Sequence, residues 1–484
     1  MFQLNQYLLS FKYSITIMFF AFVAAPAHAH AQRLALHTLP PVVSAAFEQA
    51  SIPSAAISTF VQEVSGDQRW IAANDAVALN PASTMKLVTS AAAMELLGPT
   101  YTWKTRAFAN GPVHGEILFG DLIIKGGGDP KLVLENFWLF LRQIRAKGVR
   151  EIRGNVVLDR TMYANDFFDP SRFDGDPAKP YNAGADALLL GYKAITLRLK
   201  PDFGTNTALV TMDIPLDGVT LVAPPLTQEA CGAWQGKLQL AMTPTSIGFN
   251  GSMPAVCGEK TWSIHPYTMS NTQYFGAVFR QMWRDLGGGL QGQVMDGVLP
   301  MEARLVAERE SVALPEVLRD MNKFSNNVIA RHLLLTIATE GGRTVGTPER
   351  GAHVIKSWLA ARGIENPEVV IENGSGLSRI ERISAATLGR ILVAAYQSST
   401  MPEFLSSLPI AGMDGTMRRR VQGRSVLGNA HIKTGSLEGV RAMAGYVHAT
   451  SGRRYAVVNL INHANAAVGQ EAQDVLLQWI YDNG

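Results

Sequence analysis

The sequence predicts a mixed α/β protein of the α+β type, in which a cluster of helices packs on an antiparallel sheet and a β-rich region is inserted. Three observations predict it. Helical periodicity marks residues 80–97 and returns after Asn271. Between these parts, residues 102–268 consist of short β-like runs broken by Gly, Pro and Asn clusters. Residues 431–461 again have the pattern of strands, so the chain closes on a sheet.

Each expected element has a signal of its own. Pro81 precedes the first helix, and Thr347 followed by Pro348 is a typical helix start. Gly363 is a typical helix stop. The expected helices cover residues 80–97, 132–147, 271–286, 314–322, 325–339, 348–362 and 471–481. The expected strands cover residues 115–124, 152–158, 207–214, 237–242, 431–435, 441–449 and 453–461.

These elements divide the chain into two regions. We expect residues 32–101 and 269–484 to form one discontinuous catalytic domain. Residues 102–268 then form an inserted β-rich region of one or two small domains. We found no internal repeat.

Composition excludes several classes of protein. Of the 484 residues, 47% are hydrophobic and 17% charged, which excludes disorder over most of the chain. With 43 Lys and Arg against 40 Asp and Glu, the net charge is +3, so a nucleic-acid partner has no support. We interpret the short run Arg418-Arg419-Arg420 as a solvated face.

The first residues predict export. Residues 1–31 combine Lys12, an apolar stretch over residues 14–25 and the small-residue sites Ala27-His28-Ala29 and Ala29-His30-Ala31, which is typical of a secretory signal peptide. The apolar stretch is shorter than the roughly 18–20 residues that span a bilayer. We therefore expect cleavage and no transmembrane anchor afterwards, with peripheral membrane contact left open.

Export gives the only two cysteines, Cys231 and Cys257, a reason to form a disulfide. The alternative is two unrelated thiols. Closing this loop would stabilise the fold by roughly 3.5 kcal/mol in the chain-entropy model. The chain has no Cys-x-x-Cys or His-Glu-x-x-His pattern, so we expect no metal site.

The first chemical motif is Ser83-Thr84-Met85-Lys86. Residues three apart on a helix share a face, so the Lys86 amine can reach the Ser83 hydroxyl and remove its proton. A free lysine has a pKa of about 10.4, so this role needs a decrease of roughly 2–3 units from burial and neighbouring cations. Taken alone, the pattern favours a serine near a helix start followed by a solvated lysine.

Two further motifs change that interpretation. Ser325-Asn326-Asn327 stands at an expected helix start, and Lys433-Thr434-Gly435 lies on an expected strand. Separately they would be an N-cap and a strand end. Together with Ser-x-x-Lys, in this order, they resemble the signature of class A β-lactamases and penicillin-binding proteins, which has Ser-Asp-Asn as its second motif.

Each motif can take a physical role. Ser325 can relay a proton between Lys86 and the leaving amine. The Asn327 amide can both donate and accept, and so can hold a substrate peptide bond.

The strand motif supplies the remaining groups. Lys433, Thr434 and Ser436 place a cation and two hydroxyls along one strand edge, where a carboxylate and an extended substrate would bind. Gly435 permits a close backbone approach. The N–H groups of Ser83 and Ser436 are the candidate oxyanion donors, each worth roughly 2.7–4 kcal/mol in the transition state.

With these motifs, the chain resembles the D-alanyl-D-alanine carboxypeptidase/endopeptidases, the class C low-molecular-mass penicillin-binding proteins. The resemblance covers almost the whole mature chain. One departure is Asn373, where the family usually has Asp. Further matching segments are Gly126-Gly127-Gly128-Asp129-Pro130, Met321-Asn322-Lys323, Asn373-Gly374-Ser375-Gly376-Leu377-Ser378-Arg379, Asp414-Gly415-Thr416 and Lys433-Thr434-Gly435-Ser436-Leu437.

The resemblance implies the penicillin-binding/serine β-lactamase-like transpeptidase fold and an exported, periplasmic serine hydrolase without a cofactor. Such an enzyme attacks the penultimate D-alanine carbonyl of peptidoglycan stem peptides, and of cross-bridges, through an acyl-Ser83 intermediate, and penicillins acylate the same serine. The alternatives are a serine β-lactamase and a catalytically idle wall-binding scaffold of the same fold.

The resemblance also implies a pocket for the substrate side chain. In the family, an acid of the inserted domain faces the cleft and receives the amino end of diaminopimelate, and Asp159 is the candidate here. Arg379 and Glu438 would complete the pocket. The alternative is that Asp159 simply ends a strand, as Asp often does.

Two other patterns are interpreted as turns. Residues 287–292 satisfy G-x-G-x-x-G but follow a helix instead of a strand. Ser375 stands between glycines like a nucleophile, yet Asn373 occupies the place of the first glycine of G-x-S-x-G, so we expect a turn near the site.

Overall fold

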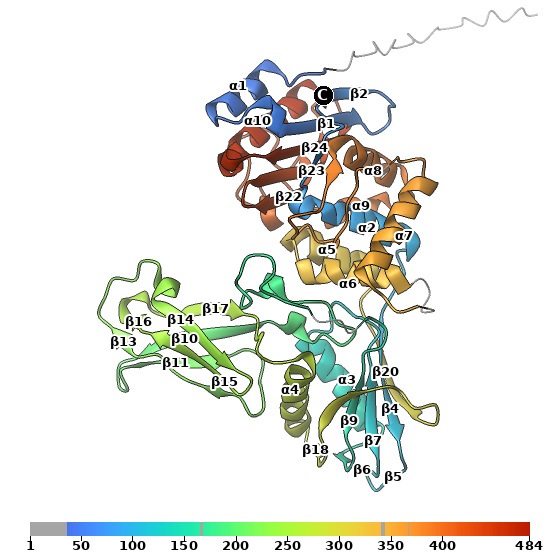
Figure 1. Cartoon of the computed structure of the whole chain (residues 1–484), viewed down its shortest axis with the longest axis vertical. Helices are drawn as coiled ribbons and strands as arrows, with labels where there is room; N and C mark the ends of the chain where they lie inside the picture. The colour runs from blue at the N-terminus through green and yellow to red at the C-terminus, as the bar shows by residue number, and fades with distance from the viewer. Residues whose placement is uncertain (1–35, 165–167, 340–343, 366) are drawn as a thin grey trace, which may run out of the picture. The chain divides into compact units, whose positions relative to one another are not determined.

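The computed structural model describes residues 36–164, 168–339, 344–365 and 367–484 (Figure 1). The expected signal peptide, residues 1–31, lies outside the described residues. Within the described residues, no helix is both long and apolar enough to cross a membrane.

An antiparallel sheet of five strands in the order β2-β1-β24-β23-β22 forms the frame of the catalytic region. Strands from the two ends of the described chain lie side by side in it, since Phe60 pairs with Val458. The β22 strand is at the edge. The strands are β1 (Ile57–Glu63), β2 (Arg69–Ala73), β22 (Ala430–Leu437), β23 (Val440–His448) and β24 (Arg454–Asn462).

Helices cover both faces of this sheet, because successive strand residues point to opposite faces and both sets are apolar. On one face Phe60, Val458 and Leu460 pack against a helical cluster. On the other face Val61 and Val457 pack against α1 and α10 (Figure 1). The helices are α1 (Pro41–Gln49), α2 (Met85–Leu96), α5 (Leu314–Phe324), α6 (Asn327–Thr339), α7 (Pro348–Ala361), α8 (Ala385–Gln397), α9 (Met401–Ser407) and α10 (Gln470–Asn483).

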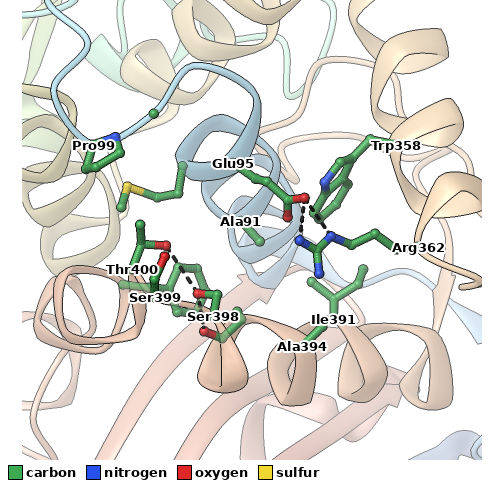
Figure 2. Close-up of a pocket in the computed structure, with 14 residues that line it drawn as sticks. Ala91, Glu95, Pro99, Trp358, Arg362, Ile391, Ala394, Ser398, Ser399 and Thr400 are labelled. Atoms are coloured by element: carbon green, nitrogen blue, oxygen red, sulfur yellow. Dashed lines mark hydrogen bonds and ion pairs between the residues drawn. The ribbon is translucent and has the colours of Figure 1, made fainter.

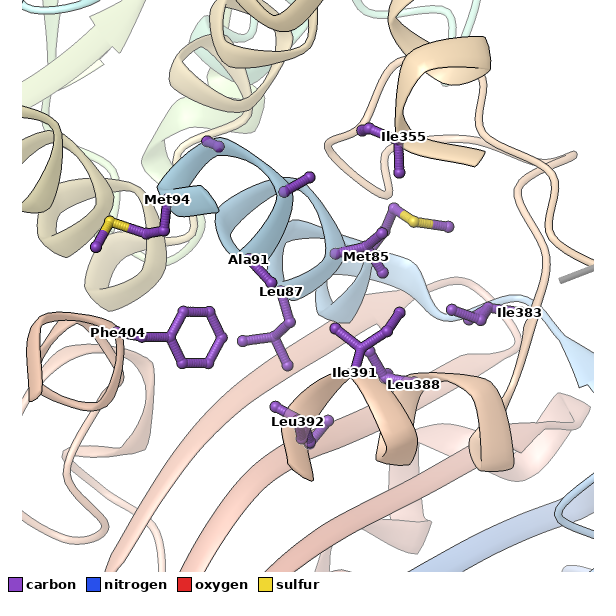
Figure 3. Packing of buried hydrophobic residues seen from close by; sticks show 14 of the residues in the cluster. Met85, Leu87, Ala91, Met94, Ile355, Ile383, Leu388, Ile391, Leu392 and Phe404 are labelled. Atoms are coloured by element: carbon purple, nitrogen blue, oxygen red, sulfur yellow. The ribbon is translucent and has the colours of Figure 1, made fainter. Parts of the chain in front are cut away.

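The α2 helix runs through the middle of the helical cluster, and residues 85–94 are all buried. Most of its side chains are apolar, as expected for a helix with no solvent face, and Lys86, Thr89 and Ser90 are its buried polar residues. Ala91 permits close approach, and Leu87 and Met94 pack near Leu392 of α8 and Phe404 of α9 (Figure 3). The start of α2 is therefore held in place by packing on all sides.

The inserted region contains two helices, α3 (Leu134–Ala146) and α4 (Asn271–Asp285), and several small sheets. One sheet has the order β19-β9-β7-β4-β20 and another β18-β8-β6-β5. These strands are β4 (Lys104–Asn110), β5 (Val113–His114), β6 (Ile117–Leu118), β7 (Asp121–Lys125), β8 (Glu151–Ile152), β9 (Val156–Asp159), β18 (Gly289–Leu290), β19 (Val294–Gly297) and β20 (Arg304–Glu310).

The rest of the insertion consists of three smaller sheets, in the orders β11-β10-β17, β12-β15-β14 and β13-β16. They share one hydrophobic core with α3, α4 and the larger sheets. The strands are β10 (Ile195–Asp202), β11 (Thr207–Met212), β12 (Thr220–Leu221), β13 (Leu226–Thr227), β14 (Leu238–Thr243), β15 (Ser246–Gly251), β16 (Met253–Pro254) and β17 (Lys260–Ile264). A separate two-stranded sheet joins β3 (Ala78–Leu79) and β21 (Ile383–Ser384).

The insertion continues beyond residue 268, where we expected it to end. Strands β18, β19 and β20 pair with β8, β9 and β4. Phe275 and Phe279 of α4 pack in the core of the insertion. Helical periodicity identified α4 correctly, but it does not encode the sheet against which a helix packs. The contacts therefore assign residues 271–310 to the inserted region.

The expected disulfide is confirmed: Cys231 and Cys257 are joined, with an S–S distance of 2.11 Å. It lies among the short strands of the insertion, where Cys257 packs against the core. A covalent link of this kind lowers the entropy of the unfolded chain.

We predict that iodoacetamide modifies neither cysteine of the native protein without reductant. Replacing both by Ala should lower the stability of the inserted region by about 3.5 kcal/mol, because the unfolded chain regains the entropy of the open loop. Urea unfolding followed by tryptophan fluorescence, with Trp234 and Trp262 packed in the insertion, measures the loss. Two alkylated cysteines in native protein would contradict the prediction.

Candidate active site

Ser83 lies in a tight turn, Ala82–Thr84, directly before α2. Ala82 has a left-handed φ of 44°, which an L-residue adopts only when its surroundings hold it. The Asn80 side chain supplies that support: its oxygen accepts from the Ala82 N–H at 2.9 Å, and its nitrogen donates to Ser378 O at 2.8 Å. The nucleophile candidate is thus fixed by a buried amide.

Two glycines let other segments lie against this turn. A Cβ at Gly376, which has a φ of 79°, would stand 1.8 Å from Ala82 O. A Cβ at Gly435 of β22 would stand 2.9 Å from Ser83 N. Real Cβ atoms do not approach so closely, so any other residue would push these segments away from Ser83. The close approach expected of Gly435 is therefore to the serine turn itself.

Lys86 is the central group of the site and has no exposed surface. Its Nζ lies 3.0 Å from Ser83 Oγ, 2.7 Å from Asn327 Oδ1 and 2.5 Å from Ser375 O. Carbonyl and amide oxygens only accept hydrogen bonds. When Lys86 is neutral, its two N–H groups can therefore serve Asn327 and Ser375, which leaves its lone pair directed at the Ser83 hydroxyl.

The surroundings of Lys86 favour this neutral form. Burial holds the pKa of Lys86 well below its usual value, and the nearby charge of Lys433 lowers the pKa further. The buried carboxylate of Glu381 acts against these effects, while Arg331 adds to them. Lys86 thus has both the geometry and the shifted pKa that a general base requires.

The second motif lies opposite. Ser325 Oγ accepts a hydrogen bond of 2.8 Å from Lys433 Nζ, which also donates to Thr434 O at 2.7 Å. Lys433 is fully buried, and burial lowers its pKa to about 7. Ser325 therefore connects the cleft to a second, buried amine.

Ser325 does not begin a helix, as we had expected. It ends α5 in the left-handed conformation with a φ of 57°, and α6 begins at Asn327. The cap is provided by Asn326, whose side-chain oxygen accepts from Ile329 N at 3.1 Å. Both Ser and Asn are good caps, so sequence alone did not distinguish them.

A supporting turn around Ser375 was only partly anticipated. One carboxylate oxygen of Glu381 accepts from the N–H groups of Glu372, Asn373 and Gly374 at 3.0, 2.9 and 3.0 Å. The Ser375 hydroxyl donates to Asn373 Oδ1 at 2.6 Å, so Ser375 is not a nucleophile. Its backbone carbonyl is what reaches Lys86. Glu381 was missed because a single acid after a turn has no distinctive signal in the sequence.

A cavity of about 320 Å³ opens beside Ser83. It contains the hydroxyls of both catalytic serine candidates and of the β22 strand, and Thr434 Oγ1 donates to Thr416 Oγ1 at 2.8 Å. Its lining residues are Ser83, Ser325, Thr416, Arg420, Thr434, Gly435, Ser436, Arg441, Ala442, Gln470 and Gln473.

Another cavity, of about 340 Å³, lies among α2, α7, α8 and α9 (Figure 2). Figure 2 shows Glu95 paired with Arg362 at its side, and Trp358 above it. This cavity contains none of the motif residues. The candidate catalytic serines Ser83 and Ser325 line the cavity beside Ser83 instead.

Comparison with known proteins agrees with this geometry. The sequence profile of the D-Ala-D-Ala carboxypeptidase 3 (S13) family matches residues 41–482. The chain belongs to this family. The expected resemblance to class C low-molecular-mass penicillin-binding proteins is thus confirmed, and the chain is a hydrolase of the D-Ala-D-Ala carboxypeptidase type.

Individual relatives are similar over most of the chain. A D-alanyl-D-alanine carboxypeptidase of Actinomadura sp. (strain R39) is 28% identical over 459 residues, covering 90% of this chain and 83% of that protein. The D-alanyl-D-alanine carboxypeptidase DacB of Haemophilus influenzae is 26% identical over 395 residues, covering 79% and 80%.

Solved structures share the fold. The crystal structure of penicillin-binding protein 4 (dacB) from Haemophilus influenzae superposes with a TM-score of 0.76 at 22% identity, covering 90% of this chain and 99% of that one. A predatory endopeptidase from Bdellovibrio bacteriovorus gives a TM-score of 0.52 at 15% identity, covering 88% and 92%. The expected fold class is confirmed.

Asp159 does not face the cleft, contrary to our expectation. It ends β9 with no exposed surface. One carboxylate oxygen accepts from Thr161, and the other accepts from Lys125 Nζ at 3.1 Å and Leu299 N at 3.0 Å. These contacts support the alternative interpretation of Asp159 as a strand end, and its expected contact with a substrate amine stays a prediction.

Arg379 and Glu438 lie near each other at the surface. Arg379 Nη2 is 3.8 Å from Glu438 Oε2, and both side chains are exposed. The guanidinium also stacks on Phe173 of the inserted region, 4.7 Å from the ring centre. Neither residue lines the cavity beside Ser83.

The insertion does contact the site, through a segment other than the one we expected. Asn327 Nδ2 lies 3.4 Å from Tyr181 O, and Arg331 of α6 donates to Tyr181 O and to Ala183 O. Other residues of the insertion contact the same helix, since Tyr163 Oη lies 2.8 Å from Thr336 Oγ1 and Asp186 O lies 3.0 Å from His332 Nε2. Several segments of the insertion therefore reach the motif helix.

The run Arg418-Arg419-Arg420 is only partly a solvated face, contrary to our interpretation. Arg418 and Arg419 are exposed, as a solvated face requires. Arg420 is buried and donates to both carboxylate oxygens of Asp474 at 2.6–3.1 Å. A run of like charges does not reveal that one member points inward.

We predict that Asp159→Asn lowers the free energy of unfolding by about 1–3 kcal/mol, because the Lys125 amine loses its charged partner. Burial alone would raise the pKa of Asp159, but the hydrogen bonds that it accepts outweigh this and keep the pKa low. The stabilisation is therefore present above about pH 4 and is lost as the pH falls through the folded-state pKa. Urea unfolding at pH 7 and at pH 3 measures both effects.

In the same variant, kcat/KM should change equally for peptides with and without a diaminopimelate side chain. A loss confined to diaminopimelate peptides would contradict the structural role of Asp159. Exposed Asp202 of β10 provides the control, since Asp202→Asn removes a carboxylate that has only local hydrogen bonds.

We predict that acylation of Ser83 by penicillin accelerates as the pH rises through the lowered pKa of Lys86 and then becomes constant. Protonated Lys86 cannot take the serine proton, so the rate falls in acid. Lys86→Ala should slow acylation by roughly 10²–10⁴-fold and abolish this pH dependence. Stopped-flow acylation at several pH values provides the measurement, with exposed Lys200→Ala of β10 as control. An unchanged rate in Lys86→Ala would exclude Lys86 as the base.

Proposed function

We propose that this chain is an exported serine D-Ala-D-Ala carboxypeptidase, and also a D,D-endopeptidase, that cleaves peptidoglycan stem peptides through an acyl-Ser83 intermediate. One observation carries the proposal: the buried Lys86 amine has two acceptors that fix its N–H groups and Ser83 Oγ as its third neighbour. This arrangement activates a serine hydroxyl, and a lysine with only a structural role would not need it.

Acylation begins when Ser83 Oγ attacks the carbonyl of the penultimate D-alanine. Lys86 takes the hydroxyl proton as the C–O bond forms. The tetrahedral oxygen receives hydrogen bonds from the N–H groups of Ser83 and Ser436, which the contact between Gly435 and the serine turn brings together. Both donors are backbone groups, so their positions are fixed before the substrate binds.

Collapse of the tetrahedral intermediate breaks the peptide C–N bond and releases D-alanine. The leaving amine takes a proton from Ser325, which is hydrogen-bonded to Lys433, and the proton that Lys86 took from Ser83 replaces it, so Lys86 is neutral again. Water then attacks the acyl-enzyme while Lys86 takes its proton. Lys86 returns this proton to Ser83 Oγ as the ester bond breaks, and the peptide leaves with a new carboxyl group. No step needs a cofactor.

The substrate binds along the edge of the sheet. The β22 strand is the last in the sheet, and only the start of its outer edge is paired, through Ile432 N to Pro409 O at 2.8 Å and Ala411 N to Ala430 O at 2.8 Å. Beyond this point its edge can offer backbone groups to an extended peptide. Thr434 and Ser436 line the cavity at this edge. A peptide added as a further strand would place its scissile bond beside Ser83.

β-Lactams fit the same site, and we propose that they acylate Ser83. A crystal structure of the Haemophilus influenzae penicillin-binding protein 4 was determined in complex with a novel β-lactam. We place the enzyme in the periplasm, because residues 1–31 have the features of a signal peptide and the stem peptides lie outside the cytoplasm.

We predict that penicillin adds its mass to the protein once and that peptide mapping places the adduct on Ser83. Ser83→Ala should neither label nor release D-alanine from an acyl-D-Ala-D-Ala peptide, since Ser83 supplies the hydroxyl that contacts Lys86. Intact-mass spectrometry and an assay for free D-alanine measure both.

The same experiment separates the alternatives. A serine β-lactamase would lose the penicillin adduct within seconds and hydrolyse a chromogenic cephalosporin with high turnover. An idle scaffold would not label at all. Ser375→Ala is the matched control, because Ser375 also lies next to Lys86 but offers it only a backbone carbonyl.

A further inference from the structure

Arg441 is a cation of the catalytic cavity that none of the motifs includes. It lies on β23 directly opposite Ser436 of β22, and both residues line the cavity beside Ser83. Side chains of such a cross-strand pair point to the same face of the sheet, with Cβ atoms about 5 Å apart. The side chains of Arg441 and Ser436 therefore leave the sheet on the same face, beside the same cavity.

Among the described residues, the charge of Arg441 has no counter-ion. Its Nε is buried without a hydrogen-bond partner, and it takes part in none of the ion pairs found in that part of the chain. Asp474 cannot serve it, because Arg420 already holds this acid with distances of 2.6–3.1 Å. Burial and the neighbouring charge of Arg420 both lower the pKa of Arg441, as expected for an uncompensated cation.

The two glutamines that line the same cavity do not compensate the positive charge of Arg441. The Gln473 side chain donates to Asn459 Oδ1 at 3.0 Å. Gln470 contributes its backbone oxygen to Arg420 at 3.2 Å. The part of the cavity around Arg441 thus has an excess of positive charge.

Lys433, which we expected to supply the cation for the carboxylate, is already engaged in this structure. Its side chain has no exposed surface, and its Nζ donates to Ser325 Oγ and to Thr434 O. The strand edge then presents only the hydroxyls of Thr434 and Ser436, which are neutral.

We propose that Arg441 binds the C-terminal carboxylate of the substrate, next to the hydroxyls of Thr434 and Ser436. The inference rests on the proposed function, since it assumes a peptide that ends in D-Ala-D-Ala. A carboxylate at this point supplies the acceptor that the buried Nε lacks and pairs the uncompensated charge. Arg441 is then a residue that makes the enzyme select the free end of a peptide.

The experiment compares an acyl-D-Ala-D-Ala peptide with the same peptide as its C-terminal amide. Arg441→Gln should lower kcat/KM for the free acid on the order of 10- to 100-fold and leave the amide almost unchanged. Arg441→Lys should retain most of the activity on the free acid, because the charge remains. Arg419→Gln, which removes an exposed arginine, is the control.

Equal losses for the acid and the amide in Arg441→Gln would overturn the proposal, because they would indicate a role in folding or in the chemistry. Equal activity of this variant and the wild type on the acid would also overturn it. If the wild type releases no D-alanine and does not label at Ser83, the proposed function itself fails. Thermal unfolding of each variant shows that it is folded.

Discussion

The site depends on one constraint: an amine must be kept out of water and still touch a hydroxyl. Lys86 meets it because α2 is buried on all sides and because two oxygens from distant parts of the chain, on Asn327 and Ser375, accept its hydrogens. Burying a lysine is unfavourable when its charge is unpaired, so the neutral form is preferred. The stability of the fold and the proposed role as a base therefore both require the neutral form of Lys86.

The rest of the architecture brings groups to that amine. The helical cluster supplies Asn327 and Ser325, and the sheet supplies Lys433 and the N–H of Ser436. Sheet and helices can meet at Ser83 only because Gly435 and Gly376 have no side chains there. The cleft is thus a junction of three segments, each of which would be displaced by one added methyl group.

Sequence reasoning singled out residues that the fold brings into contact where the proposed chemistry restricts the residue type. Lys86 contacts Ser83 and Asn327, and Lys433 contacts Ser325, although the motifs are far apart in the chain. It did not anticipate that Asp159 is buried, since an acid after a strand looks the same whether it is buried or faces a cleft. It did not anticipate the burial of Lys433 either, because a one-dimensional motif does not show which side of a strand is buried.

Long-range packing set the other limits of prediction. The helical pattern of α4 was clear, but its place in the core of the insertion depends on contacts with strands far away in the sequence. Glu381 and Arg441 have no local sequence signature. The role of each depends on neighbours that only the folded chain brings together. Strands β1 and β2 and helices α1 and α8 also went unpredicted.

The pairing of β1 with β24 has a consequence for the order of events during folding. The Thr59 side chain accepts a hydrogen bond from Asn459, 400 positions later in the chain. Closing such a contact is entropically expensive and slow, whereas the insertion, which is continuous in sequence, can form from nearer contacts. Ser83 is synthesised early, but the proposed oxyanion donor lies on β22, at the edge of a sheet that includes the last strands of the chain. On the proposed function, Ser83 therefore becomes reactive only after these strands have joined the sheet.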